Sequence, residues 1–198
     1  MKAKYSIPTF CRPCGFSMVE LLIVMGILML LVAVSIPALS GMKRSSDMQV
    51  GASRLIEQFQ LARQLARVKN RPVQVRIFPD DKAQSDKNAS IQLYIARDDG
   101  EYEAAERKIV LPNGVGFSTS GGFSDLLTDY SQKTNDSKNG DFYIFSFRAG
   151  GHPNVSTTNK PPVITLMPRA DVAAAQLPPN FVTLQVEPQT GRSRIYRP

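Results

Sequence analysis

Histidine and cysteine are scarce in this chain of 198 residues, and each scarcity excludes a class of chemistry. His152 is the only histidine, and both cysteines, Cys11 and Cys14, lie within the first 15 residues. Acid–base catalysis by histidine and nucleophilic catalysis by a thiol therefore have almost no residues to use. The sequence also contains no glycine-rich phosphate-binding loop. We expect a protein that is not an enzyme and that holds no cofactor.

The residues that typically bind metals do not combine into a site. Cys11 and Cys14 have the Cys-x-x-Cys spacing of redox and zinc sites, but the chain has no second pair of ligands and no βαβ pattern around them. His152 stands between a glycine and a proline, which favours a turn. Asp80-Asp81 and Asp98-Asp99-Gly100 lack the spacing of a calcium loop and indicate solvated turns. We therefore expect no metal.

Charge is missing from the stretch Leu21–Met42, and acidic residues are missing before Glu20. A helix of these 22 residues, rising about 1.5 Å per residue, matches the roughly 30 Å hydrocarbon core of a bilayer. The sequence therefore predicts a single membrane-spanning helix. Basic residues before it favour a cytoplasmic N-terminus by a narrow margin, because Lys43 and Arg44 follow closely. The preceding basic residues are Lys2, Lys4 and Arg12.

The order of features at the N-terminus differs from that of an ordinary secretory signal. A short basic leader ends in Gly15, and the apolar stretch comes after it with no clean cleavage site at its far end. Glu20 lies at the start of this stretch, although a carboxylate costs about 2.5–3.5 kcal/mol at a bilayer centre and less near an interface. Charges within membranes are usually paired. The amine of a new N-terminus at Phe16 in a neighbouring chain would be a suitable partner.

Gly15, Phe16, the glutamate five residues after the glycine and the apolar helix together resemble the signal of type IV prepilins. The resemblance implies that a prepilin peptidase cuts after Gly15 and that the amine of Phe16 becomes methylated. It also implies that Glu20 pairs with the N-terminal amine of an adjacent subunit. Pro37 fits the same pattern, and because proline lacks an N–H we expect a helix kink there. The alternative interpretation is an uncleaved single-pass anchor.

Residues 43–71 have the period of an amphipathic helix that continues the apolar one. We expect its apolar stripe to pack on a domain core rather than to recognise a partner. Asn70-Arg71-Pro72 should end the helix, because residues before proline disfavour the helical conformation. The stripe consists of Met48, Ala52, Leu55, Phe59, Ala62 and Ala66, with Ile56 and Leu65 beside it.

Residues 72–198 show alternating apolar and polar side chains without a convincing helical period, which predicts an antiparallel β-rich domain. The fold class is therefore α+β, with a long N-terminal helix packed on this domain. Ser118–Gly140 is rich in small and polar residues and indicates a mobile surface loop or an insertion. The predicted strands are Val73–Ile77, Ile91–Ile95, Arg107–Leu111, Val115–Ser118, Phe142–Arg148, Val163–Met167, Phe181–Glu187 and Ser193–Arg197.

This layout resembles the minor pseudopilins of type II secretion, of the H type, and the related minor pilins of type IV pili. The resemblance rests on Leu61–Arg67 followed by Arg71-Pro72-Val73, on Phe147–Gly150 and on Thr190–Arg194. It implies a structural subunit incorporated into a filament, with residues 1–15 as leader and the β-rich domain in the periplasm of a bacterium. The implied partners are other pilins or pseudopilins, prepilin peptidase, the inner membrane and secreted cargo. The lack of cysteine after residue 15 disfavours the major pilins, where a C-terminal disulfide loop is common.

Basic residues gather at the C-terminus, where Arg192, Arg194 and Arg197 fall within seven residues. The formal net charge is +7, of which three charges belong to the leader, so the overall excess does not by itself imply nucleic acid. Gly191–Arg194 resembles the DNA-contacting tail of some minor pilins used in DNA uptake, which makes DNA a second candidate partner. The alternative is an edge strand whose charges keep it soluble.

Overall fold

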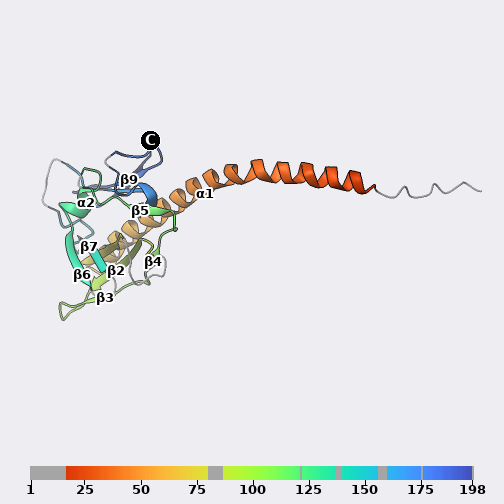
Figure 1. The fold of residues 1–198 in the computed structure, drawn as a ribbon. Helices are drawn as coiled ribbons and strands as arrows, with labels where there is room; N and C mark the ends of the chain where they lie inside the picture. Colours follow the sequence, from red (N-terminus) through yellow and green to blue (C-terminus); the bar gives the residue numbers. More distant parts are fainter. Residues whose placement is uncertain are drawn as a thin grey trace, which may run out of the picture. The chain divides into compact units, whose positions relative to one another are not determined.

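The structure is a computed structural model in which one helix, α1 (Met18–Val68), enters a domain of two β-sheets (Figure 1). The chain divides into two compact units, Met1–Gly41 and Met42–Pro198, and α1 contributes residues to both. The structure describes residues 17–79, 87–120, 122–136, 140–155, 160–174 and 176–197, without the side chains of 34–42 and 136.

In the first unit, the described part of α1 is apolar on every side. Its large apolar side chains between Met18 and Val32 are 45–87% exposed. The backbone stays helical across Pro37, whose side chain is outside the described ones, so the predicted kink stays a prediction. Within the described residues, no helix has both the length and the apolar character that a membrane span requires.

In the second unit, α1 buries the predicted apolar stripe. All six residues of the stripe, from Met48 to Ala66, are at most 3% exposed. Phe59 lies at its centre, with its ring centroid 5.7 Å from that of Phe145 and 6.2 Å from that of Phe147. The expectation that this face packs on a core is therefore confirmed.

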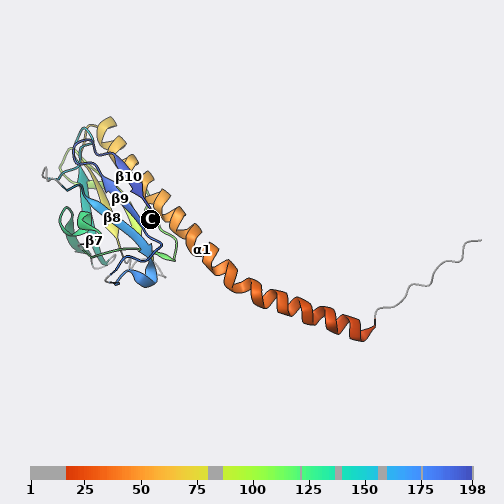
Figure 2. The same cartoon turned by 90° about the horizontal axis from the view of Figure 1, so that it is seen from above.

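Two antiparallel sheets complete the core, and Figure 2 shows strands of the second sheet alongside α1. The first sheet has the order β3-β2-β1-β7-β6, and the short strand β4 pairs with β2. Its strands are β1 (Val73–Phe78), β2 (Ser90–Ala96), β3 (Tyr102–Ala104), β4 (Ile109–Val110), β6 (Gln132–Asp136) and β7 (Gly140–Phe147). The second sheet has the order β10-β9-β8-β5. Its strands are β5 (Val115–Phe117), β8 (Val163–Pro168), β9 (Val182–Val186) and β10 (Ser193–Tyr196).

Strand register explains which side chains reach the core. In β1, Val73, Val75 and Ile77 are buried, while the residues between them are partly exposed, as expected for a strand with one face on a core. Val75 pairs with Leu93 of β2 and with Phe145 of β7, so three strands present apolar residues at the same level. The predicted α+β fold, an N-terminal helix on an antiparallel β domain, is confirmed.

The prediction of a mobile loop at Ser118–Gly140 is wrong. The segment contains α2 (Asp125–Thr128) and strand β6, and the side chains of Leu126 and Leu127 are buried in the core. Buried polar contacts fix α2 on β8, since the Val163 N–H donates to Asp125 Oδ1 at 2.7 Å and the Thr165 N–H donates to Ser124 Oγ at 3.0 Å. The small and polar composition of the segment gave no indication of these buried contacts.

The sequence did not predict two further elements, and it predicted one strand that is longer than the observed one. Strand β3 follows the Asp98-Asp99-Gly100 turn, and a single 3₁₀ turn, η1 (Arg169–Asp171), follows β8. The strand predicted at Arg107–Leu111 shortens to β4, which has two residues. Short edge elements carry too few residues for a period of two to be recognised in the sequence.

Candidate functional site

The N-terminal segment places one carboxylate at the start of an exposed apolar helix. Glu20 lies in the first turn of α1 and is exposed. The turn is closed by Ser17, whose carbonyl oxygen accepts from the Leu21 N–H at 3.2 Å and whose Oγ accepts from the Val19 N–H at 3.3 Å. A carboxylate in the first helical turn is favoured by the helix dipole. Gly15 and Phe16 lie outside the described residues, so cleavage and methylation stay predictions.

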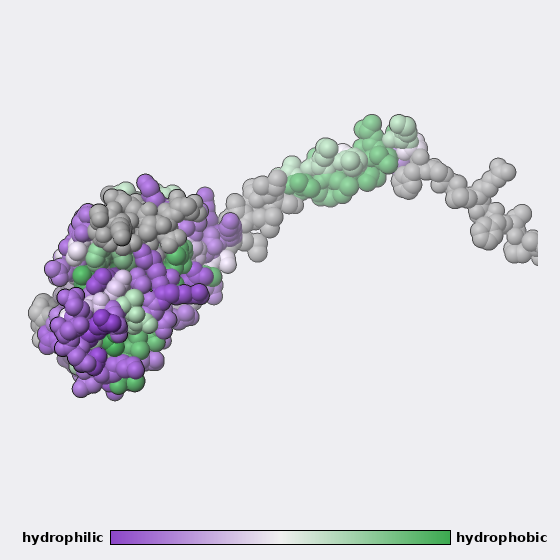
Figure 3. Space-filling model, turned by 90° about the horizontal axis from the view of Figure 1, so that it is seen from below, coloured by the Kyte–Doolittle hydropathy of each residue, from purple (hydrophilic) through white to green (hydrophobic). Residues whose placement is uncertain are grey.

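Glu20 has no charged neighbour along this part of the helix. It is the only ionisable side chain between Ser17 and Ala33, and Figure 3 shows hydrophobic colour along most of the stretch. A helix that is apolar all round normally lies in a membrane or in the core of a larger assembly. The arrangement therefore offers an apolar surface for lipid or for other helices, with one charge available to an incoming cation.

The C-terminal arginines divide into a pair and a separate residue. Arg192 precedes β10 and Arg194 lies within it, both exposed, and β10 is an edge strand of its sheet. Since side chains alternate along an extended chain, the two share a face. Arg197 follows the strand and lines a different groove of about 210 Å³, with Ser45 and Gln49 of α1 among its other walls.

Two arginines of α1, which sequence reasoning missed, extend the C-terminal pair. Arg63 Nε donates to the Thr190 carbonyl oxygen at 2.8 Å. The pKa of Arg63 is lowered, first by burial and then by the positive charges of Arg67 and Arg192. Their spacing of four residues, which puts Arg63 and Arg67 on one helix face, was the signal available in the sequence.

Arg63, Arg192 and Arg194 border a groove of about 280 Å³ between α1 and the start of β10. Ser193 also lines it, and its buried Oγ has no hydrogen-bond partner among the described residues. Guanidinium groups, amides and a hydroxyl are all donors for an oxyanion. The lining residues are Gln60, Arg63, Gln64, Gly191, Arg192, Ser193 and Arg194.

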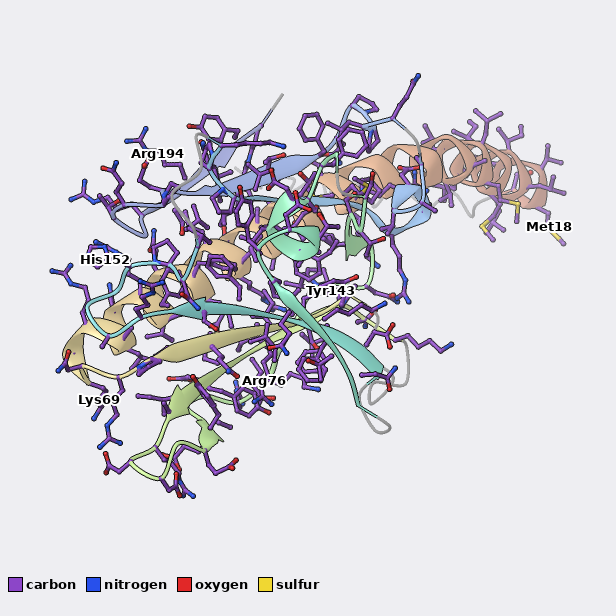
Figure 4. The ribbon with its side chains drawn as sticks, turned by 90° about the vertical axis from the view of Figure 1, so that its left-hand side faces the viewer. Met18, Lys69, Arg76, Tyr143, His152 and Arg194 are labelled. Carbon is purple, nitrogen blue, oxygen red and sulfur yellow. The ribbon has the colours of Figure 1, made fainter. Side chains whose placement is uncertain are left out.

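Two glycine turns hold this basic end in place. Gly191 has φ +67°, and a Cβ added there would lie 2.3 Å from the Gly151 carbonyl oxygen. Gly151 has φ +80°, and a Cβ added there would lie 2.6 Å from Arg67 Cγ and 3.0 Å from the Arg63 carbonyl oxygen. His152, labelled with Arg194 in Figure 4, is exposed and hydrogen bonds through Nδ1 to the Gln189 carbonyl oxygen. His152 is thus a turn residue that ties two loops together.

A comparison with protein families identifies the N-terminal segment. The model described as the prokaryotic N-terminal methylation motif matches residues 12–36. This chain carries the N-terminal methylation motif of prepilin-type proteins. The matched range contains the glycine, the phenylalanine and the glutamate on which the sequence prediction rested.

Comparisons of the whole chain with known sequences and structures give weaker matches than the N-terminal motif. No curated protein matches in sequence. Two solved structures of the minor pseudopilin EpsH from the type II secretion system of Vibrio cholerae are similar, each with 11% sequence identity and a TM-score of 0.48. One match covers 77% of this chain and the other covers 78%, and both cover 98% of the EpsH chain.

Proposed function

We propose that this protein is a minor pilin or pseudopilin, a structural and assembly subunit of a type II secretion pseudopilus or a type IV pilus. The observation that carries the proposal is the methylation motif at residues 12–36, which continues into an exposed helix that is apolar on every side. The role is binding and assembly rather than turnover. Its partners are other pilins or pseudopilins, prepilin peptidase and the inner membrane, with secreted cargo as a further one.

Before assembly, residues 16–42 hold the chain in the inner membrane as a single pass, with the N-terminus cytoplasmic and the β-rich domain periplasmic. Prepilin peptidase then cuts after Gly15, and the amine of Phe16 is methylated. The apolar side chains exposed along α1 leave lipid and pack against like helices. Such packing needs close contact, since helices in lipid associate through van der Waals contacts and polar pairs.

Glu20 supplies the polar pair in this scheme. Its carboxylate is exposed and stands alone among apolar side chains in the described part of the first unit. Pairing with the Phe16 amine of a neighbouring subunit offsets the cost of placing a charge in an apolar environment. The charge therefore favours one register between adjacent helices, which a purely apolar helix would not specify.

Co-expression with a prepilin peptidase tests the proposal. We expect the mature chain to begin at Phe16, as read by N-terminal sequencing, and Gly15→Ala to block the cut. Gly26→Ala is the matched control, because no atom lies within 4 Å of a Cβ added there, and it should be processed normally. Glu20→Gln should be cut but should be recovered poorly in sheared filaments. Normal processing of Gly15→Ala, or normal incorporation of Glu20→Gln, would contradict the proposal.

A second candidate is a minor pilin that binds DNA during DNA uptake, and the arginine cluster of α1 and β10 favours it. Arg63, Arg192 and Arg194 line one groove. The pKa of Arg63 is lowered first by burial and then by the positive charges of Arg67 and Arg192. Unneutralised guanidinium groups attract phosphates, and the resulting binding weakens as salt rises. Arg197, at the far end of β10, would contribute to the same field from a separate position.

A gel-shift titration of the full chain in a nonionic detergent tests this candidate. We expect Arg192→Ala with Arg194→Ala to lower the affinity, and each lost phosphate contact to reduce the salt slope by about 0.9. Arg107→Ala, another exposed arginine, is the control and should leave the slope unchanged. Failure to shift DNA even at low salt would exclude the candidate and leave the assembly role intact.

A further inference from the structure

A third groove, whose lining contains none of Arg63, Arg192 and Arg194, runs between α1 and β4. It has a volume of about 430 Å³ and is lined by Arg54, Glu57 and Gln58 of α1 and by residues 107–110. A neighbouring groove of about 540 Å³ shares Arg54 and Glu57 and continues along α1 to Ser46. From Ser46 to Gln58 the helix rises roughly 18 Å at about 1.5 Å per residue. That length matches about five residues of extended chain at about 3.3 Å each.

One wall of this groove is an open strand edge. Among the described residues, β4 pairs with β2 alone, through Ser90↔Val110 and Ile91↔Ile109. The Leu111 N–H donates to the Ala89 carbonyl oxygen at 2.8 Å, which makes the next pair, Val110 with Ser90, a non-hydrogen-bonded one. The N–H and the carbonyl of Val110 therefore both point away from β2. Arg54 donates to that carbonyl from α1, which shows that the outward side of β4 accepts a polar partner.

A buried amide lies at the other wall. Gln58 is 8% exposed, lines the groove, and its Oε1 has no hydrogen-bond partner among the described residues. A buried acceptor without a donor costs about 1–3 kcal/mol, so a donor brought to this position would be favoured. The terminal torsion of glutamine has a broad minimum, which allows the oxygen to turn toward the groove.

The charges of the groove select an acidic occupant. Among the described residues that line it, Arg54, Arg107 and Lys108 are cationic and Glu57 is acidic. Lys108 is held in place, with its Nζ 4.2 Å from the centroid of the Phe78 ring. Val50, which is 40% exposed, lines the neighbouring groove and adds apolar surface. An occupant that alternates acidic and apolar side chains fits both features.

We propose that the groove between α1 and β4 docks an extended acidic peptide segment of a partner protein, which adds as a strand to the open edge of β4. Main-chain hydrogen bonds to Val110 would give affinity, and carboxylates facing Arg54 and Arg107 would give specificity. This goes beyond incorporation into a filament, because neither the processing at Gly15 nor the apolar helix takes part. The peptide-binding assay below can therefore fail while the proposed function holds. Likewise, the processing and filament assays can fail while the peptide binds.

The probe is the labelled peptide acetyl-Glu-Val-Glu-Val-Glu-amide, titrated by fluorescence anisotropy into the full chain in a nonionic detergent. We expect Arg54→Glu to weaken binding about tenfold, since it reverses a charge that the peptide contacts. Arg192→Glu makes the same change at the basic end and should alter the affinity less than about twofold. If Arg54→Glu lowers the stability of the chain, Arg107→Glu provides the same test of binding at an exposed position.

A peptide with the same side chains but with every backbone amide N-methylated separates strand addition from simple charge attraction. It keeps every carboxylate and lacks the N–H groups that pair with a strand edge, so we expect it to bind about tenfold more weakly. The unmodified peptide should also slow hydrogen exchange of the Val110 amide. Equal loss with Arg54→Glu and Arg192→Glu would overturn the proposal, as would equal binding of the two peptides. Either result would mean that Arg54 only closes the edge of β4 within the chain.

Discussion

The two stretches of α1 bury apolar surface in different ways. Between Met18 and Val32 the large apolar side chains are 45–87% exposed, whereas between Met48 and Ala66 the apolar stripe is at most 3% exposed. The second stretch has a polar face and a partner, the two sheets of the same chain. The first has no polar face, and no partner within the described residues. Its apolar surface is exposed, and we therefore expect it to contribute little to the folding of the second unit.

This difference means that stability and assembly should respond to separate substitutions. Core residues of the second unit determine the free energy of unfolding, because removing buried side chains loses transfer energy and leaves a cavity. Under the proposed function, residues of the first unit determine association with other subunits. Each prediction below measures unfolding of the full chain in a nonionic detergent, and each compares a buried position with an exposed one.

Phe59→Ala gives the largest effect. The ring is fully buried and stacks at 5.7 Å on Phe145, so its loss should lower the free energy of unfolding by about 3–5 kcal/mol. Leu28→Ala, on the same helix but 50% exposed, should change it by less than about 0.5 kcal/mol. Urea unfolding followed by circular dichroism measures both. Comparable losses in the two variants would show that the stretches of α1 fold as one structure.

Gly191→Ala follows, because both backbone conformation and space oppose a side chain there. A positive φ costs about 1–3 kcal/mol for a residue other than glycine, and the Gly151 carbonyl oxygen must also move away from the new Cβ. Gly100→Ala has a positive φ as well, but no atom lies within 4 Å, so only the conformational cost applies. The midpoint temperature of thermal unfolding should therefore be lower for Gly191→Ala than for Gly100→Ala. Equal midpoints would mean that the two turns at the basic end are not in contact.

The elements of the second unit that sequence predicted are those with long, regular patterns. Strands β1 and β2 show a period of two, and the stripe of α1 shows a helical period. The burial of one face of each element could therefore be predicted from the sequence. Helix α2 was not predicted, because its position depends on Ser124 and Asp125 reaching the backbone of β8, about 40 residues away. A contact of that range leaves no local signal.

The candidate sites also differ in whether the local sequence or only the tertiary structure identifies them. Glu20 was identified from its position in a contiguous motif, which needs no tertiary structure. Arg192 and Arg194 were found as neighbours in sequence, but the adjacent Arg63 was not, since only the packing of α1 beside the Thr190 turn brings it there. The groove at β4 depends on a strand edge and on the burial of Gln58, neither of which sequence reveals.

Asp125→Ala should have a smaller effect than the glycine substitution. The carboxylate is 1% exposed, accepts from the Val163 N–H and lies 2.9 Å from Lys160 Nζ, so its loss leaves a partly buried donor without a partner. We expect a loss of about 1–3 kcal/mol in urea unfolding. Asp98→Ala removes an ion pair with Arg71 at the surface and should cost no more than about 1 kcal/mol. If both cost the same, Asp125 does not anchor α2.

Alkaline pH gives the smallest effect and tests the same anchor from its exposed side. The pKa of Lys160 is raised above its ordinary value of 10.5, first by its hydrogen bond to Asp125 and then by the charge of that carboxylate. The folded state thus holds the proton more tightly than the unfolded state. The pair's stabilisation is complete below the unfolded pKa and is lost as pH rises through the folded pKa.

Urea midpoints measured across this alkaline range should therefore fall in the wild type and fall less in Lys160→Gln. The pKa of Lys133 is raised in the same way by Asp141, so Lys133→Gln serves as the matched control at another surface pair. Asp125 is buried, whereas the Asp141 side chain is 46% exposed, which leads us to expect the flatter profile for Lys160→Gln. Identical profiles for the two variants would mean that burial of one partner does not strengthen the pair. The contrast between buried and exposed positions would then apply to apolar side chains and not to charges.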